Sequence, residues 1–247
     1  MLRSGFVVAL YTLLSRILGM AREIFVSNLF GSGPVADSVN VAFKLPNLFR
    51  RIFAEGALAS VFVPIFSSKL LESQKSAEKF ASKVFWLLII TLICVILVMQ
   101  YFMPELMIIM APGFHGHPEK FDLTILLCRI TMPYLLFISI ASFIGGMLNS
   151  VGRFASFAFV PVLLNLAVIF GTMGLSHYML DAIAISYSII LGGVLQVAFM
   201  IIAGKYANLH IRSTKGVVTP DKDINKLLRM MVPATISSGS AQISIFI

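Results

Sequence analysis

Charged residues are scarce in this sequence, which has 247 residues of which only 12% are Asp, Glu, Lys or Arg. A water-soluble domain of average composition carries about 25%. Hydrophobic residues make up 58% of the chain, and the mean hydropathy is +0.94. So few polar side chains could not cover a water-facing surface. A soluble globular domain is therefore excluded, and we expect the chain to lie in a membrane.

Cysteine is also scarce, and the motifs of catalysis are missing. The two cysteines, Cys94 and Cys128, both fall inside apolar runs, which gives no framework for a disulfide or a metal site. The sequence has no glycine-rich phosphate loop ending in Gly-Lys-Ser or Gly-Lys-Thr, and no spacing typical of a nucleophile triad or a metal cluster. We therefore expect a protein that is not an enzyme and that needs no cofactor and no metal.

Long apolar runs are what the sequence does have. Each run is continuous rather than alternating, which predicts helices and not a β-barrel. The expected fold is an all-α, polytopic membrane protein with six transmembrane helices and the start of a seventh near residue 226. The basic, polar stretch 67–83 is expected to form a surface helix. The six spans are predicted at 5–30, 36–66, 84–110, 121–149, 155–177 and 181–203.

These spans divide the chain into three parts. Residues 1–205 would form a lobe of six helices, residues 206–225 a basic connecting loop, and residues 226–247 the start of the seventh span. The sequence stops at Ile247 within that span, without a polar or basic anchor. We therefore expect a fragment of a longer protein or a truncated gene product.

The net charge of +8 is distributed unevenly over the predicted loops. On one side the loops and their flanks hold twelve basic residues, whereas the other side holds only Lys120. This bias predicts that the N-terminus and the basic loops are cytoplasmic. It also accounts for the charge without a nucleic-acid partner. The twelve residues are Arg3, Lys69, Lys75, Lys79, Lys83, Arg153, Lys205, Arg212, Lys215, Lys222, Lys226 and Arg229.

Other basic residues lie within the spans. One of them at the bilayer centre costs roughly 2.5–3.5 kcal/mol, and several facing lipid would cost about 10 kcal/mol, as much as the stability of a whole domain. We therefore expect most of them to face the bundle interior or a wet cavity, since snorkelling to an interface explains only one or two. The residues within the spans are Arg16, Arg22, Lys44, Arg50, Arg51 and Arg129.

Acidic residues compensate part of this charge in the first two spans. Arg51 and Glu55 are four residues apart and are expected to pair on one helix face. Arg22 and Glu23 are adjacent, so we expect their side chains to point apart without neutralising each other. The first two spans hold five of the six basic residues, and the acids that oppose them are Glu23, Glu55 and Asp37. Five bases against three acids leave a surplus of two positive charges. Such a surplus favours an anionic ligand, and guanidinium groups suit phosphate oxygens.

The helix geometry limits how these arginines can act together. At 100° per residue, Arg16 and Arg22 lie about 120° apart around an ideal helix. They meet one ligand only if the helix bends near Gly19 or if the cavity wraps around the helix. Pro46 is a second hinge candidate, because proline removes a backbone hydrogen bond just before Asn47 and Arg50.

The remaining polar and small residues in the spans suggest packing roles. Arg129 is expected to snorkel or to form a structural pair. Asn149, Asn165 and Gln196 are expected to make hydrogen bonds between helices rather than to contact a ligand. The pairs at 145–146 and 192–193, each Gly-Gly, predict close helix packing.

Several motifs occur in a fixed order and together resemble the MurJ/MviN family of lipid II flippases. The block at 42–64 is the most specific of them, whereas APGF or GGVLQ alone would be weak. The motifs are SRILGMARE (15–23), AFKLPNLFRRIFAEGALASVFVP (42–64), APGF (111–114), GGMLNSVGRF (145–154), PVLLN (161–165), GGVLQ (192–196) and QIS (242–244).

The resemblance implies a fold of the multidrug/oligosaccharidyl-lipid/polysaccharide exporter type, in which two six-helix lobes surround a central cavity. This chain would supply the N-terminal lobe. The implied function is to move lipid II, a lipid-linked peptidoglycan precursor, from the inner to the outer leaflet by alternating access. The protein would then be a multi-pass protein of the bacterial inner membrane whose partners are lipid II, membrane lipids and cell-wall synthesis proteins.

The resemblance also implies which residues bind the substrate. The family's arginines for the diphosphate fall on Arg16, Arg22 and Arg50, and a further family arginine in the seventh helix would lie beyond Ile247. Acidic family positions fall on Asp37 and on Glu23, where aspartate is usual. Polar family positions fall on Ser15 and Asn47.

Three alternatives stay open on the sequence alone. The chain could export another lipid-linked oligosaccharide or a drug, although a cavity for cationic drugs should carry surplus acid rather than surplus base. It could be a scaffold in a cell-wall synthesis complex that transports nothing. It could also be a truncated fragment that does not function alone.

Overall fold

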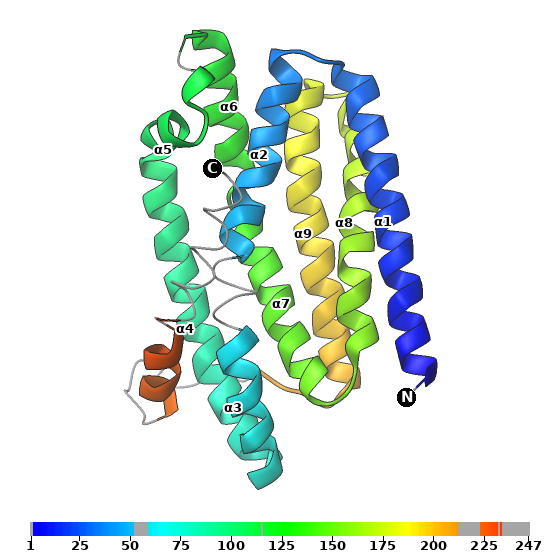
Figure 1. Ribbon diagram of the computed structural model, residues 1–247, viewed down its shortest axis with the longest axis vertical. Coiled ribbons are helices and arrows are strands. Elements are labelled where there is room, and N and C mark those ends of the chain that lie inside the picture. The colour runs from blue at the N-terminus through cyan, green and yellow to red at the C-terminus, as the bar shows by residue number, and fades with distance from the viewer. Residues whose placement is uncertain (1, 52–58, 115, 212–222, 232, 234–247) are drawn as a thin grey trace.

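The computed structural model describes residues 2–51, 59–114, 116–211, 223–231 and 233, and all regular structure within them is helical (Figure 1). A further short helix spans residues 223–231. The labelled elements are α1 (Leu2–Phe30), α2 (Pro34–Arg50), α3 (Ala59–Glu72), α4 (Gln74–Tyr101), α5 (Met103–Met110), the short 3-10 turn η2 (Pro112–Phe114), α6 (Pro118–Thr131), α7 (Tyr134–Ser150), α8 (Phe154–Leu175) and α9 (Asp181–Tyr206).

The all-α, polytopic membrane fold is confirmed. Within the described residues, five segments are long and apolar enough to cross a membrane, and they correspond to five of the six predicted spans. The other predicted span, 36–66, covers most of α2 and the first half of α3, and its residues 52–58 lie outside the described residues. The same holds for most of the predicted seventh span. The five segments are Gly5–Phe30, Gln74–Tyr101, Pro118–Ser150, Phe154–Leu175 and Asp181–Tyr206.

The stretch 67–83 does not form a separate surface helix, so this prediction is wrong. Instead α3 continues to Glu72 and α4 begins at Gln74. Ser73 alone separates them, and its side chain caps α4 by accepting a hydrogen bond from the Ser76 N–H at 3.1 Å. Good helix formers in this stretch let both helices extend past their apolar parts. Ser73 then supplies the cap that starts the second helix.

Several prolines interrupt the backbone ladder of the described helices, and at two of them a side-chain donor reaches the freed carbonyl. Pro46 lies inside α2 and leaves the Ala42 carbonyl without its helical partner, and the Thr131 hydroxyl donates to that oxygen at 2.8 Å. Pro133, between α6 and α7, frees the Arg129 carbonyl in the same way, and Gln100 Nε2 donates to it at 2.8 Å. Pro46 is therefore accommodated in a continuous α2 rather than at a break.

Glycines allow the central helices to pack closely, as the sequence predicted. A Cβ added at Gly145 would lie 2.5 Å from Phe157 Cδ2, and one at Gly192 would lie 2.8 Å from Leu164 Cδ1. At Gly193 the added atom would lie 2.9 Å from Phe137 Cβ. Carbon atoms in ordinary contact are about 3.5–4.0 Å apart. The helices α7, α8 and α9 therefore pack closely at these glycines, most tightly where Gly193 faces the Cβ of Phe137, which cannot turn aside.

The helices are arranged so that α1 and α2 diverge. They meet at a turn in which Gly31 has a φ of +61°, a conformation that suits glycine. Beyond the turn, α1 packs mainly against α8, and α2 packs mainly against α6 (Figure 1). The separation of α1 from α2 leaves room for a cavity between them.

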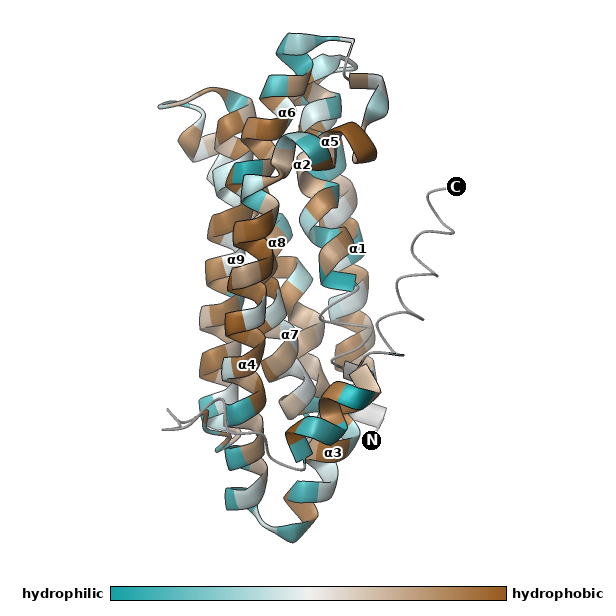
Figure 2. Ribbon diagram, turned by 90° about the vertical axis from the view of Figure 1, so that its left-hand side faces the viewer, coloured by the Kyte–Doolittle hydropathy of each residue, from teal (hydrophilic) through white to brown (hydrophobic). Residues whose placement is uncertain are grey.

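Hydrophilic residues gather toward the two ends of the bundle, and hydrophobic residues dominate the middle of α4, α8 and α9 (Figure 2). The N-terminus, the α3–α4 corner, the α7–α8 turn and the end of α9 lie at one end of the bundle (Figure 1). The basic residues Lys69, Lys75, Arg153 and Lys205 belong to these segments, whereas Lys120 belongs to α6 at the opposite end.

Candidate functional site

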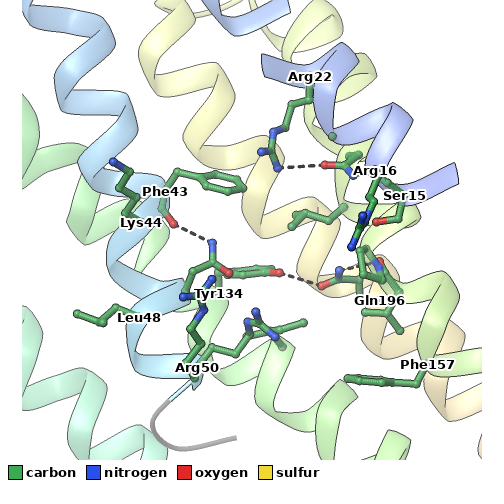
Figure 3. Close-up of a pocket in the computed structure, with 18 residues that line it drawn as sticks. Ser15, Arg16, Arg22, Phe43, Lys44, Leu48, Arg50, Tyr134, Phe157 and Gln196 are labelled. Atoms are coloured by element: carbon green, nitrogen blue, oxygen red, sulfur yellow. Dashed lines mark hydrogen bonds between the residues drawn. The ribbon is translucent and has the colours of Figure 1, made fainter. Parts of the chain in front are cut away.

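A cavity of about 940 Å³ lies between α1 and α2 and is closed behind by α7, α8 and α9 (Figure 3). Five basic side chains line it, and none of the described residues that line it is acidic. Two come from α1, and the others come from α2 and the residue after it. The five are Arg16, Arg22, Lys44, Arg50 and Arg51. A site with this charge, between apolar helices, attracts anions.

The first helix reaches this cavity with Arg16 and Arg22 without a break. It is one continuous α-helix through Gly19, and Arg16, Gly19 and Arg22 all line the cavity. Figure 3 shows the two arginines projecting from α1 and Arg50 projecting from α2. The cavity therefore extends along enough of α1 to meet both arginines, and the helix is not broken between them.

The guanidinium group of Arg22 is held from three sides. Its Nη1 donates to Asn165 Oδ1 at 3.0 Å, and its Nη2 pairs with the carboxylate of Glu23. The centre of the guanidinium lies 4.3 Å from the centroid of the Phe43 ring, which is a cation–π contact. The Arg22 side chain is only 15% exposed. It is therefore oriented before any ligand arrives.

The expectation that Arg22 and Glu23 do not neutralise each other is wrong, since the two form an ion pair. The side chains of adjacent residues project from a helix about 100° apart, but these two are long enough to meet along its surface. Glu23 is 61% exposed and does not line the cavity. It therefore reduces the charge of Arg22 from outside the cavity.

Uncharged polar groups form the wall opposite α2. Tyr134 from α7 donates its hydroxyl to Gln196 Oε1 at 3.2 Å, and Gln196 Nε2 donates to the Val160 carbonyl at 2.8 Å (Figure 3). Asn165 Nδ2 donates to the Ser15 carbonyl at 3.2 Å. The expectation that Asn165 and Gln196 make hydrogen bonds between helices is confirmed. Both residues also line the cavity, which the sequence did not indicate.

The structure brings five of the seven candidate residues together, because Ser15, Arg16, Arg22, Asn47 and Arg50 all line the cavity. The other two candidates, Glu23 and Asp37, do not line it.

Asp37 lies near the start of α2, at the end of the bundle opposite the basic segments. Its Oδ2 accepts from Lys120 Nζ at 2.6 Å, and the same ammonium lies 3.8 Å from the centroid of the Phe114 ring. One turn further along, Thr124 donates to the buried hydroxyl of Ser38 at 2.9 Å. Asp37 therefore joins α2 to α6.

Sequence reasoning missed some of the residues that line the cavity. Arg51 lines the cavity, which the sequence did not indicate. Its predicted pair with Glu55 involves a residue outside the described part of the chain, so this pairing stays a prediction. Phe43 and Tyr134 had no signal in a chain so rich in aromatic residues. Arg129 is an exposed residue of α6 and does not line the cavity.

Comparison with solved structures defines the class of protein. A structure described as lipid II flippase MurJ in the inward closed conformation aligns with a TM-score of 0.77 and 26% identity, covering 96% of this chain and 48% of that one. A MATE structure in the bent conformation aligns with a TM-score of 0.74 and 17% identity, covering 99% of this chain and 54% of that one, which shows the fold alone. The chain is therefore a multi-pass membrane protein with the helical fold of one half of these transporters.

The sequence comparisons name the family. Residues 26–247 match the family described as lipid II flippase MurJ. A probable lipid II flippase MurJ from Rickettsia prowazekii is 54% identical over 245 residues, which cover 99% of this chain and 48% of that protein. A lipid II flippase MurJ from Burkholderia cenocepacia is 31% identical, with 99% and 48% covered. This chain belongs to the MurJ family.

The resemblance seen in the motifs is thereby confirmed. The family is one of transport proteins rather than enzymes, as expected. The chain spans about half the length of the curated relatives that it matches.

Proposed function

We propose that this chain is the N-terminal lobe of a flippase for lipid II, in which the basic cavity binds the diphosphate of the lipid-linked precursor. Alternating access would then move the headgroup from the inner to the outer leaflet, while the polyprenyl tail stays in lipid between helices. The partners are lipid II, membrane lipids and cell-wall synthesis proteins. The family membership supports the substrate, and the cavity supports the binding site.

The observation that carries this proposal is the charge of the cavity. Five basic side chains line it, and the described lining residues include no carboxylate. Arginine forks bind phosphate oxygens in pairs, and a diphosphate offers several such oxygens. A transporter of cationic drugs would need the opposite charge. The geometry therefore favours Arg16, Arg22 and Arg50 as ligands of the diphosphate, with Ser15 and Asn47 as polar neighbours.

The placement in the membrane is part of the same proposal. The protein would reside in the bacterial inner membrane, with its N-terminus and the basic end of the bundle in the cytoplasm. Residues 1–205 would form the lobe, 206–225 the connecting loop and 226–247 the start of the seventh span. Asp37 and Glu23 would act through Lys120 and Arg22 rather than by touching the substrate, since neither carboxylate lines the cavity.

The proposal is tested by complementation in cells depleted of their own flippase. The chain is expressed alone and fused to the C-terminal half of the Rickettsia prowazekii relative. We expect the fusion to restore growth and headgroup translocation. Failure of the fusion would refute the proposed activity, and rescue by the chain alone would refute the need for a second lobe.

Substitutions in the rescuing form test the site. Arg22→Ala and Arg50→Ala are each expected to lower translocation about tenfold or more, because each removes a charged ligand of the diphosphate. Arg129→Ala is the matched control, since this exposed arginine lies outside the cavity and its carbonyl contact survives truncation. Undiminished translocation in both cavity variants would refute the assigned role.

A further inference from the structure

Asn165 lies in the middle of α8, faces α1 and is only 5% exposed. It makes two hydrogen bonds to α1, one with the Arg22 side chain and one with the Ser15 backbone. The partners are 143 and 150 positions away in the sequence. This residue therefore connects two segments of the cavity wall at the level of the arginines.

The orientation of the Asn165 amide follows from its two partners. The Ser15 carbonyl can only accept a hydrogen bond, and the Arg22 guanidinium can only donate. The amide therefore places Nδ2 on the carbonyl at 3.2 Å and Oδ1 on the guanidinium at 3.0 Å. In a flipped amide, the Asn165 amide N–H would face the donors of Arg22, and the amide oxygen would face the Ser15 carbonyl oxygen, so neither hydrogen bond could form. The carbonyl oxygen of Asn165 is thus held toward Arg22.

This contact decides which donors of Arg22 remain for a ligand. A guanidinium group has five N–H donors, of which Asn165 and Glu23 each take one. The Phe43 ring covers one face of the group at 4.3 Å. The other three donors have no hydrogen bond to these partners, and Arg22 lines the cavity. A ligand that arrives there meets a guanidinium that has already lost most of its freedom, which favours binding.

We propose that Asn165 is a positioning residue for anion binding: its amide, oriented by the Ser15 carbonyl, holds the Arg22 guanidinium in the geometry that receives the diphosphate. The inference rests on the proposed function, since it assumes that the cavity takes a diphosphate. Asn165 acts through Arg22 and needs no contact of its own with the substrate. Asparagine suits the position because it accepts from Arg22 without adding a charge that would repel the anion.

The test measures the dissociation constant of undecaprenyl diphosphate for the form that rescues growth, purified in detergent micelles. Asn165→Ala is expected to weaken binding about tenfold, because a hydrogen bond that orients a charged group is lost. Asn165→Asp keeps an acceptor for Arg22 but brings a negative charge beside the anion. It is expected to weaken binding about a hundredfold.

A double substitution shows whether Asn165 acts through Arg22. Lysine lacks the planar fork that Asn165 holds, so Asn165→Ala should weaken binding less than twofold when Arg22→Lys is already present. Thr172→Ala is the matched control, because it removes another buried hydrogen bond of α8, from Thr172 to Ser188 at 3.3 Å, away from the cavity lining. It should leave the dissociation constant unchanged.

Each outcome decides between the explanations. Wild-type affinity in both Asn165 variants, with lowered thermal stability, would show a purely structural residue and overturn the inference. A full tenfold effect of Asn165→Ala in the Arg22→Lys background would also overturn it. Absence of diphosphate binding by the unaltered protein would instead refute the proposed function, and the inference with it.

Discussion

Replacing Gly193 with alanine is expected to push α9 away from α7. The added Cβ would lie 2.9 Å from Phe137 Cβ and 2.9 Å from Tyr134 Cδ2. Phe137 Cβ is fixed by its backbone and cannot turn aside, so one helix must shift by about 0.6–1 Å to restore normal carbon contacts. Overpacking of this kind costs roughly 1–3 kcal/mol of folding free energy.

A matched alanine substitution isolates this cost. Gly174 lies in α8, where an added Cβ meets nothing within 4 Å. Both substitutions gain up to about 1 kcal/mol from the higher helix propensity of alanine. The difference between the two variants therefore reports the clash alone, and we expect Gly193→Ala to be less stable than Gly174→Ala by about 1–3 kcal/mol.

The assay is thermal unfolding in detergent micelles, followed by the helical circular dichroism signal. At about 2–4 °C per kcal/mol for a chain of this size, Gly193→Ala should melt about 2–12 °C below Gly174→Ala. Equal melting temperatures, or the reverse order, would refute the close approach of α7 and α9. The added Cβ would also clash with Tyr134, which donates to Gln196, so the same substitution should disturb the cavity wall.

Two further predictions concern contacts between α2 and α6. Thr131→Val should destabilise the protein by about 1–3 kcal/mol, because the Ala42 carbonyl loses its donor. The cost should fall when Pro46→Ala restores the N–H that donates to this carbonyl in a regular helix. Thermal unfolding of the single and double variants measures both costs, and an equal cost in the two backgrounds would contradict the prediction. Asp37→Lys should lower translocation, and adding Lys120→Asp should restore part of it if Asp37 acts through Lys120. If the double variant restores nothing in the complementation assay, direct contact of Asp37 with the substrate is favoured.

The class of fold was predictable because its signals are local. Each span depends on the length and hydropathy of one run of residues, and the bilayer thickness sets both. The predicted bounds differ from the observed ones where the helices pass beyond their apolar parts. For example, α4 begins at Gln74 rather than at 84, because the Ser73 cap and good helix formers extend it. Glycine pairs such as Gly192-Gly193 also predicted their close packing correctly.

The site was predictable in part. The unfavourable energy of arginine in lipid indicated that Arg16, Arg22 and Arg50 face a cavity, and all three line it. The roles of the acids were not predictable in the same way. Which base a carboxylate meets depends on the neighbouring helix, and Lys120 lies 83 positions from Asp37.

The sequence by itself determined that this is a helical membrane protein of the MurJ family with surplus positive charge in its first two spans. Those properties follow from composition, run length and motif order, which need no knowledge of packing. The tertiary structure alone decided how the charges are grouped. The divergence of α1 from α2 opens the cavity, and α8 places Asn165 against Arg22. Asp37 pairs with Lys120 of α6, outside the cavity. Distances between residues remote in sequence are set by helix packing, and no local pattern encodes them.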